Sequence, residues 1–469
     1  MVPQKKLIFE QTGIVSAAIR PQYIQHEFIV PGGLSDLFVE LDYENLGSNT
    51  LYVSTYDGQS FRGNQMKPGK KGAVHLEIRL GIAESGPGGI PGPIGPGVWR
   101  AQIDVADVKS DQTYSLRVYG SAAEQTGEPF RLVLTDPVLS REARYYKGEL
   151  HSHTIESDGK FSVQDVVAEA ERLQLDFLAI TDHITTSQWV RMQALETHTM
   201  ALLHSCEVTS RHGHANLHGI HRWVDVYTDR EGWDMNRVAD DVNSQGGLFC
   251  VNHAFSGGRL GYRSFYFDWH KADLMEIYHN LEGCNNQPML SYWDHLMLRG
   301  YRIVGVGGTD SHDPFTGNHK LGQCLTYVHT DELSEKGILR GLVGGNVYVS
   351  KGAQLRFTAR DARGQIYQMG QEVLTDEPIL LNIQAQCDEP LIAFIMRDGL
   401  MYDHRVLDEN KTDWQTWELS VPGAGAHFYR IELHAAHAES HDPCFKAILW
   451  RDHISMRAYS NPIFIQNKD

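Results

Sequence analysis

Apolar and polar residues alternate along the first 135 residues of the chain. The stretch SDLFVELDY, residues 35–43, has apolar side chains at positions 37, 39, 41 and 43, and Leu116 and Val118 continue the period of two. Because this alternation is typical of strands with one buried face, we predict an antiparallel β-sandwich. The run SGPGGIPGPIGPG, residues 85–97, is too short for a collagen triple helix and leads into the strand-like VWRAQIDV, so we expect a long ordered loop there.

A second pattern begins after a plausible linker, residues 135–146. Short apolar runs typical of fully buried strands are separated by helical segments; the runs are FLAIT (177–181), GLFCVN (247–252), LMEIY (274–278) and YRIVGVGG (301–308). Alternation of β and α segments predicts a parallel sheet or barrel.

Two of the intervening helices have recognisable ends. Ser162 and Asp165 resemble a capping box, and apolar residues then recur at positions 163, 166, 167, 170 and 173. Met289, Trp293 and Leu296 have the same helical spacing and precede Gly300, a residue suited to a helix end.

The period of two returns after residue 350, where Leu381, Ile383, Ala385 and Cys387 alternate with other residues. A chain of 469 residues is expected to form two or three domains. We predict an N-terminal β-sandwich over 1–140, a catalytic α/β domain over 146–350 and a C-terminal β-rich sandwich over 351–469.

Composition excludes several classes of function. A formal net charge of −17 opposes binding to nucleic acid, since that affinity depends on Lys and Arg contacting phosphates. No apolar run approaches the roughly 20 residues that span a bilayer. The start, MVPQKKLIFEQTGIV, lacks an apolar core behind its lysines, so we expect no secretory leader and a cytoplasmic protein. Six cysteines without a C-x-x-C pair are expected to be reduced and mostly buried. The oligomeric state stays open.

Histidines gather in the middle of the chain, where 16 of the 24 lie between residues 151 and 350. Many of them, together with acidic residues, directly follow a predicted strand, and such strand ends converge on one face of a parallel barrel. Imidazole and carboxylate groups without cysteine are expected ligands for zinc, manganese or iron. The residues placed in this way are His151, His153, Asp182, His183, Glu207, His253, Asp310 and His312.

The motifs ELHSHTIESDG, AITDHI, CEVT, ANLHGI, VNHAF and GGTDSHD, in this order, resemble those of the PHP (polymerase and histidinol phosphatase) family of metallohydrolases. The flanking GPIGPGVWRAQ and AYSNPIFI are similar to segments of its CehA/McbA branch. The resemblance implies a distorted (β/α)7 barrel holding two or three divalent ions (Zn, Mn or Fe), with Glu207 as a bridging carboxylate. The family often has proline where this chain has Ala254. The implied ligands are His151, His153, Asp158, His183, Glu207, His218, His253, Asp310 and His312.

Neighbouring residues are candidates for supporting roles. Asp182 either holds the imidazole of His183 or caps a helix. Arg211 is placed to meet a substrate anion, whereas His212 and His214 are expected in a solvated loop. Glu276, His279 and Asn280 are expected to line the pocket, and the predicted catalytic or supporting set is Asp182, Arg211 and His279.

Two further patterns are interpreted as structural. His434, His437 and His441 have ligand-like spacing but are expected in a solvated loop. Gly307 and Gly308 are expected to allow close backbone packing, because the patterns of phosphate-binding loops are absent.

The metals implied by the resemblance would activate a bridging hydroxide as the nucleophile, and no G-x-S-x-G motif competes with it. The function favoured is hydrolysis of a small phosphate ester. Hydrolysis of a carbamate or carboxylic ester is the alternative. A noncatalytic carbohydrate- or protein-binding module with a structural metal is a third.

Overall fold

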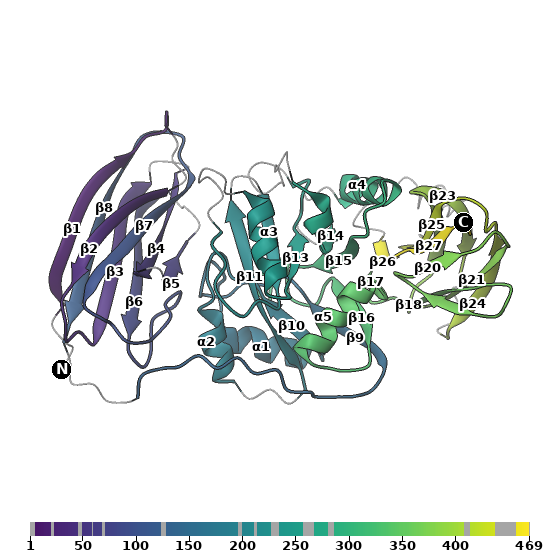
Figure 1. The fold of residues 1–469 in the computed structure, drawn as a ribbon, viewed down its shortest axis with the longest axis horizontal. Coiled ribbons are helices and arrows are strands. Elements are labelled where there is room, and N and C mark those ends of the chain that lie inside the picture. The colour runs from purple at the N-terminus through teal and green to yellow at the C-terminus, as the bar shows by residue number, and fades with distance from the viewer. Residues whose placement is uncertain are drawn as a thin grey trace.

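The computed structural model describes most of the chain, and its strands and helices form three parts that follow one another along the long axis (Figure 1). Strands predominate, and the five α-helices of the described residues all lie in the middle part. The described residues are 5–19, 23–45, 49–58, 60–67, 71–122, 128–195, 199–210, 213–226, 234–256, 267–279, 286–407, 413–436 and 456–468.

The N-terminal part consists of two four-stranded antiparallel sheets. Side chains of both sheets share one core that includes Leu37, Val39, Leu41, Val53 and Ile103, as the alternation predicts. One sheet has the order β1 (Lys6–Val15), β8 (Gln112–Ser121), β3 (Asp36–Asn45), β6 (Gly72–Gly81); the other has the order β2 (Tyr23–Val30), β7 (Gly97–Asp107), β4 (Thr50–Asp57), β5 (Ser60–Gln65).

The middle sheet is mixed and not purely parallel, which corrects the prediction. Strand β12 runs antiparallel to both of its neighbours, and β16 runs antiparallel to β9 and β17. Only two residues separate β11 from β12, too few for the crossover that a parallel pair requires. The order is β15 (Val304–Gly308), β14 (Leu274–His279), β13 (Leu248–Val251), β12 (Gly213–His218), β11 (Ala201–Ser210), β10 (Phe177–Ile180), β9 (Arg144–Glu149), β16 (Leu325–Thr330), β17 (Val347–Ser350).

These ladders form an open path, so they do not show the (β/α)7 barrel that the resemblance implies. The sheet nevertheless curls, because side chains from strands along its whole length meet in one buried cluster. At the two ends of the curl, the Thr326 hydroxyl lies 3.0 Å from both the backbone N and O of Gly307. The cluster includes Tyr146, Phe177, Leu203, Cys250, Leu274, Val306, Val328 and Val347.

The helices pack against the sheet with the ends that the sequence predicts. Helix α1 (Val163–Arg172) begins with the capping box of Ser162 and Asp165, and Gly300, with φ +90°, follows α4 (Asn286–Leu298). The others are α2 (Gln188–Gln193), α3 (Met235–Ser244), α5 (Glu335–Gly344) and the short 3-10 helix η1 (Trp269–Lys271). None of the described helices combines the length and apolar character that a bilayer crossing requires.

The C-terminal part continues the middle sheet, because β26 pairs with β17. The path runs on through β26 (Met456–Ser460), β25 (His427–Ala435), β22 (Leu391–Arg397) and β23 (Leu400–Val406), with β27 (Ile463–Gln466) and β20 (Glu372–Leu374) alongside. A separate sheet has the order β19 (Ile366–Gln368), β18 (Gln354–Arg360), β21 (Ile379–Gln386), β24 (Gln415–Val421). The alternating residues of β21 face the shared core of these sheets.

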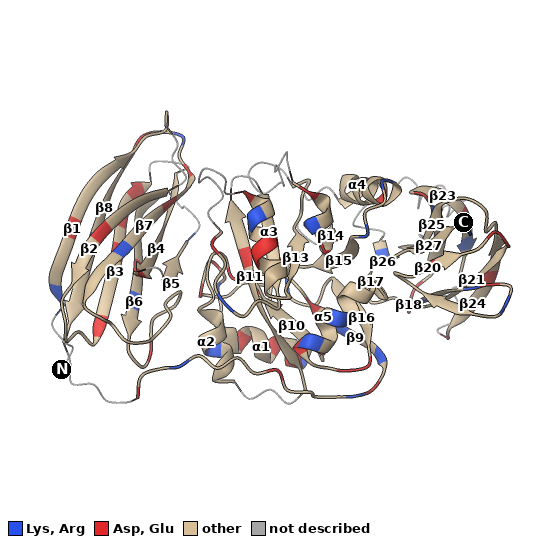
Figure 2. Ribbon diagram, viewed as in Figure 1, with Lys and Arg blue, Asp and Glu red and all other residues tan. Residues whose placement is uncertain are grey.

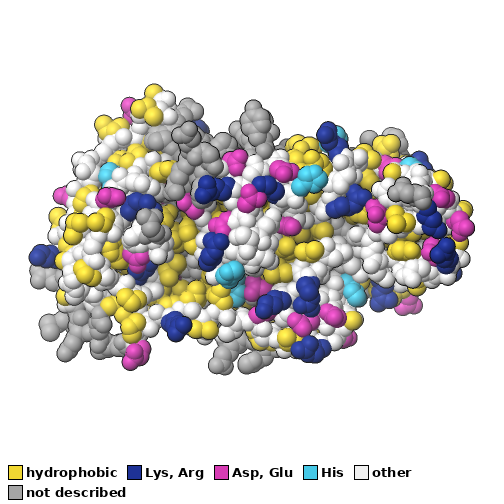
Figure 3. All heavy atoms as spheres, in the orientation of Figure 1, with side chains coloured by type: hydrophobic (Ala, Val, Ile, Leu, Met, Phe, Trp, Pro, Cys, Tyr) yellow, Lys and Arg dark blue, Asp and Glu magenta, His cyan; other side chains and the backbone are white. Residues whose placement is uncertain are grey.

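Charged residues are interspersed along the helices and strands (Figure 2). Helix α3 carries Arg237 close to Asp240 and Asp241. On the face shown in Figure 3, basic and acidic side chains lie next to one another over the middle part, and they do not gather into one basic area.

Candidate metal centre

The middle sheet brings polar residues from distant parts of the sequence to one place, as the strand-end pattern predicts. His151 and His153 follow β9 and Asp310 follows β15 as expected, whereas Glu207 lies inside β11 and not after a strand, which corrects its expected place. The ring Nε2 atoms of His151 and His153 lie 3.3 and 3.4 Å from Glu207 Oε2, and 3.2 and 2.9 Å from Asp310 Oδ1. All four residues are buried, so two imidazoles and two carboxylates surround one point.

A second group adjoins the first through His153. The rings of His183 and His312 each stack on the His153 ring at a centroid distance of 4.3 Å, and their own centroids lie 6.2 Å apart. Asp158 Oδ1 lies 3.6 Å from His183 Nε2 and 3.2 Å from His312 Nε2. His153, Asp158, His183 and His312 therefore offer ligand atoms that are close enough to hold one ion.

A third group adjoins the first through Glu207. His214 Nδ1 lies 3.2 Å from Glu207 Oε1, and His183 Nδ1 lies 2.9 Å from Glu207 Oε2. His253 Nε2 approaches Glu207 Oε1 to 3.6 Å. Glu207 thus contacts imidazoles on several sides, the arrangement that a bridging carboxylate requires.

His214 was expected in a solvated loop, and that expectation is wrong. It is buried in β12, where Glu207 pairs with Asn216 and Thr209 pairs with His214. Since alternate residues of a hairpin share a face, residues 214, 216 and 218 all lie on the face of Glu207. The alternation in GHANLH, residues 213–218, was the signal that would have placed His214 with the carboxylate.

His218 is buried on the same face as Glu207, and its Nδ1 lies 3.0 Å from the hydroxyl of Ser205. Burial, together with the nearby His151, lowers the pKa of His218 to about 3. Its ring is therefore neutral, as a metal ligand must be, but its role as a ligand stays a prediction.

Asp182 does not hold the imidazole of His183, as one of its two expected roles required. Its carboxylate accepts hydrogen bonds from the Thr154 N–H and hydroxyl, at 2.8 and 2.6 Å, and from the Ser157 hydroxyl at 2.6 Å. These bonds shape the loop that carries His153 and Asp158. Glu149 acts similarly, because its carboxylate accepts bonds from the His151 N–H and from the Thr309 N–H and hydroxyl. Asp182 is therefore a positioning residue.

Glu276 and His279 lie against the first group, as expected. Glu276 Oε1 lies 2.6 Å from His151 Nδ1, and Oε2 accepts the backbone N–H of His253 at 2.9 Å. His279 Nε2 lies 3.6 Å from Asp310 Oδ2. A carboxylate on the second nitrogen of a ligating imidazole sets its tautomer and orientation.

Gly308 allows these groups to approach one another. A Cβ atom at this position would lie 2.6 Å from Glu276 Oε1 and 2.7 Å from the His151 Cβ. At Gly307 it would lie 2.5 Å from a Val349 methyl group. The prediction of close packing at this glycine pair is therefore confirmed.

Several nitrogen and oxygen atoms of these residues lack hydrogen-bond partners, and this makes the site suitable for divalent cations. Among the residues that the structure describes, His151 Nε2, both ring nitrogens of His153, Glu207 Oε2 and Asp310 Oδ1 are buried and make no hydrogen bond. A buried polar atom without a partner is costly, and a metal ion would satisfy all of these atoms. No other ligand chemistry suits converging imidazole nitrogens and carboxylate oxygens as well.

The pKa shifts of Glu207 and His153 agree with this fit, whereas the carboxylates around His151 and His312 outweigh burial and raise the pKa of these two rings. Burial would raise the pKa of Glu207, but the imidazoles of His183, His151 and His214 lower it well below its ordinary value. Burial lowers the pKa of His153 to about 4, and the neighbouring His183 and His312 act in the same direction. An ionised carboxylate and a neutral imidazole are the forms that bind metals.

Several candidates fall elsewhere. Arg211, His212, Asn280, His437 and His441 lie outside the described residues. His434 was expected with His437 and His441 in a solvated loop, and for His434 that expectation is wrong. It is buried in β25, where its Nε2 lies 3.1 Å from Glu432 Oε2. It therefore belongs to the core of the C-terminal part. Four cysteines are free thiols, as expected: Cys206, Cys250, Cys324 and Cys387.

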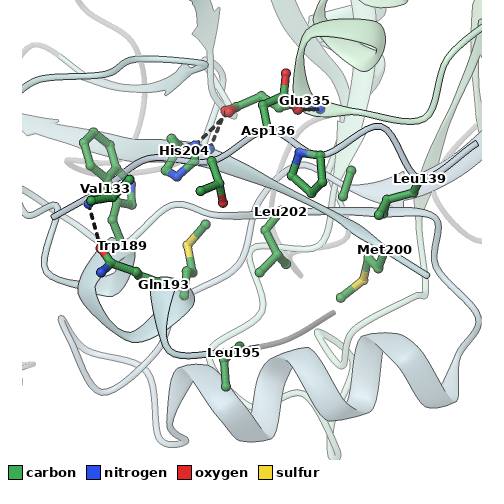
Figure 4. A pocket seen from close by; sticks show the side chains of 14 residues that line it. Val133, Asp136, Leu139, Trp189, Gln193, Leu195, Met200, Leu202, His204 and Glu335 are labelled. Atoms are coloured by element: carbon green, nitrogen blue, oxygen red, sulfur yellow. Dashed lines mark hydrogen bonds and ion pairs between the residues drawn. The ribbon is translucent and has the colours of Figure 1, made fainter. Parts of the chain in front are cut away.

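A cavity of about 400 Å³ lies between residues 133–139, helix α2, the start of β11 and the first turn of α5 (Figure 4). At its edge His204 Nδ1 lies 2.7 Å from Glu335 Oε2, and the Glu335 N–H donates to Asp136. None of the residues that line it belongs to the three groups described above, so we assign it no part in metal binding.

No family model matches this sequence, and no curated protein matches it. Among solved structures, one similar chain is a two-domain protein from Bacteroides vulgatus ATCC 8482 that contains a predicted PHP-like metal-dependent phosphoesterase; it is 16% identical, the match covers 66% of this chain and 95% of that chain, and the TM-score is 0.39. Another is a candidate metal-dependent phosphoesterase from Bifidobacterium adolescentis ATCC 15703, at 17% identity, 38% and 91% coverage and a TM-score of 0.29. At these identities and TM-scores, neither likeness bears on the activity of this chain.

Proposed function

We propose that this protein is a PHP-like metal-dependent hydrolase that acts on a small phosphate ester. The observation that carries the proposal is the sharing of ligands between three adjoining groups: His153 belongs to the first and second, and Glu207 belongs to the first and third. A structural metal needs one closed set of four ligands. Overlapping sets instead suit two or three neighbouring ions, the arrangement of metal centres that hydrolyse esters.

When bound, divalent ions would lower the pKa of a water molecule and polarise the ester oxygen. The chain's own residues bind these ions and fix their positions. His151, His153, Glu207 and Asp310 would hold one ion, and Asp158, His183 and His312 would hold a second beside it. His253 and His214 meet the opposite side of Glu207, where a third ion would lie.

The supporting residues limit the freedom of these ligands. Glu276 orients the His151 ring and accepts the backbone N–H of His253. Asp182 holds the loop that carries Asp158, and Glu149 holds the loop that carries Asp310. Ligands that are already in place need little rearrangement when charge develops in the transition state. No Ser-His-Asp arrangement is needed for this chemistry.

The test compares two ester classes with one enzyme preparation. Purified protein reconstituted in parallel with Zn²⁺, Mn²⁺ or Fe²⁺ is assayed with an aryl phosphate and with an aryl carbamate that share one leaving group. The proposal expects metal-dependent turnover of the phosphate. Turnover of the carbamate alone would move the assignment to the alternative class that the CehA/McbA resemblance implies, and bound metal without turnover of any ester would favour a binding protein.

A further inference from the structure

The glycine- and proline-rich segment of the N-terminal part touches the loop that carries the metal ligands. The guanidinium of Arg191, on α2, donates to the carbonyl oxygens of Ser85 and Gly86 at 2.8 and 3.0 Å. The Gly88 N–H donates to Glu156 Oε2 at 2.8 Å. Glu156 lies in the same loop as His153 and Asp158, so two parts of the chain meet beside the candidate metal centre.

Glu156 is the residue on which these contacts converge. It is 2% exposed, and its other carboxylate oxygen accepts a hydrogen bond from Arg191 Nε at 3.0 Å. One carboxylate thus joins the N-terminal segment to helix α2. An uncompensated carboxylate at this depth would be costly, so the two partners stabilise the position of Glu156.

The loop that Glu156 belongs to is tight enough to transmit its position to Asp158. The N–H groups of Ser157 and Gly159 both donate to the carbonyl oxygen of Thr154. A Cβ atom at Gly159 would lie 2.6 Å from the backbone of His153, so the turn is closely packed. Asp182 holds this turn by accepting bonds from Thr154 and Ser157, and Glu156 ties it to Gly88 and Arg191.

The N-terminal segment is built to present a rigid contact, and the expected long ordered loop is confirmed. Gly88 has φ +76°, and a Cβ atom there would lie 1.9 Å from the carbonyl oxygen of Asn64, so only glycine fits. The Arg62 guanidinium donates to the carbonyl oxygens of Gly92 and Pro93, at 3.1 and 3.0 Å. An arginine that binds several carbonyls holds the segment in one shape.

A second contact joins the same two parts. The rings of Phe61, on β5, and Trp223 stack at a centroid distance of 3.9 Å with planes 7° apart. Trp223 lies five residues after His218, the end of β12. The N-terminal part therefore contacts the chain on either side of the centre, near Asp158 and beyond β12.

We propose that the N-terminal sandwich supports the metal centre through Arg191 and Glu156, and that this clamp sets the metal affinity of the group formed by Asp158, His183 and His312. The inference rests on the proposed function, since it concerns the same centre. Glu156 and Arg191 are positioning residues, because they act through Asp158. The first group shares His153 with this loop, but its other ligands, His151, Glu207 and Asp310, lie outside it, so we expect the first group to keep its ion.

The test uses the full chain and measures metal directly. Wild type, Glu156→Gln and Arg191→Ala are loaded with Zn²⁺, and zinc content and release to a chromogenic chelator are followed. In Glu156→Gln one carboxylate oxygen becomes an amide NH2 group, which can accept neither from the Gly88 N–H nor from Arg191, so one of the two bonds is lost. We expect the most weakly held zinc to bind about 10- to 100-fold more weakly, as for other residues that support ligands, while the tightly held zinc is unchanged. Arg172→Ala is the control, since Arg172 pairs with Glu169 on α1 and lies away from the clamp.

The outcomes separate the inference from the proposed function. If wild type binds no zinc, the proposed function fails with it. If wild type binds zinc and both variants release every zinc at the wild-type rate, only the clamp is wrong. Circular dichroism and thermal unfolding check the fold; should Arg191→Ala aggregate, the Glu156→Gln comparison decides. Uniform loss of all zinc in a folded Glu156→Gln variant would also overturn the inference, because the clamp is expected to act on one group.

Discussion

At the scale of single residues, Glu207 is the centre of the account. It is fully buried and lies within 3.6 Å of His151, His153, His183, His214 and His253. The sequence singled out Glu207 as a carboxylate in a histidine-rich region, but its expected place after a strand is corrected, because β11 (Ala201–Ser210) continues beyond it. His214 was not expected beside Glu207, although the alternation of residues 213–218 was a signal for it.

We predict that Glu207→Gln keeps the fold but loses most of its turnover. A neutral amide cannot bridge two cations as a carboxylate does, and each lost factor of ten in rate corresponds to about 1.4 kcal/mol of transition-state stabilisation. The measurement is kcat together with metal content at saturating metal. Wild-type kcat in a variant with full metal content would remove Glu207 from the centre.

The placement of His214 leads to a second prediction. His214→Ala should lower the metal affinity at Glu207, because its ring lies 3.2 Å from that carboxylate. Isothermal titration with Zn²⁺ measures this affinity. His329→Ala is a matched control, since His329 lies on β16 and packs against Tyr145. Equal affinity in the two variants would show that His214 is a buried histidine without a ligand role.

At the scale of elements, sequence patterns predicted strands and helix ends well, and pairing poorly. The buried runs 177–181, 247–252 and 274–278 and the capping box of α1 depend on local sequence, so they could be recognised. The pairing of β12 with β13 and of β26 with β17 depends on contacts between distant residues, to which no local pattern points. The burial of His434 beside Glu432 was missed for the same reason.

The contact between α4 and β25 shows how a distant pairing stabilises the fold. Arg430 is fully buried and forms two bonds with Asp294, at 2.8 and 2.7 Å, and one with Glu432 at 2.7 Å. Arg430→Ala would leave two buried carboxylates without this guanidinium, so we predict a loss of about 3–5 kcal/mol in unfolding free energy. Urea unfolding measures the loss. A change below about 1 kcal/mol would mean that the carboxylates are neutralised or solvated in the variant.

At the scale of the whole molecule, the metal centre is expected to hold the middle part together. Its ligands come from segments between residues 151 and 312, so an ion that binds only the folded state stabilises it by linkage. We predict that EDTA lowers the melting temperature and abolishes hydrolysis, and that added Zn²⁺ or Mn²⁺ restores both. At a metal concentration of about 100 times Kd the stabilisation is about 2.7 kcal/mol. Full activity and an unchanged melting temperature in metal-free protein would contradict this.

The flanking parts are expected to shape access to the centre without supplying an essential ligand, a prediction that follows from where the ligands lie. All nine residues that the sequence analysis assigned as ligands fall between 151 and 312. Through the contacts of Glu156 and Arg191 with residues 85–88, the N-terminal part also holds the loop of Asp158 in place. Such contacts could not be predicted from sequence, because they join segments that share no pattern.

The most direct test of the central claim is an anomalous-scattering map of crystals of the purified, metal-loaded protein, recorded at the absorption edge of each candidate metal. The account predicts two or three neighbouring peaks, one between His151, His153, Glu207 and Asp310 and another beside Asp158, His183 and His312. An active crystal without an anomalous peak among these residues would contradict it.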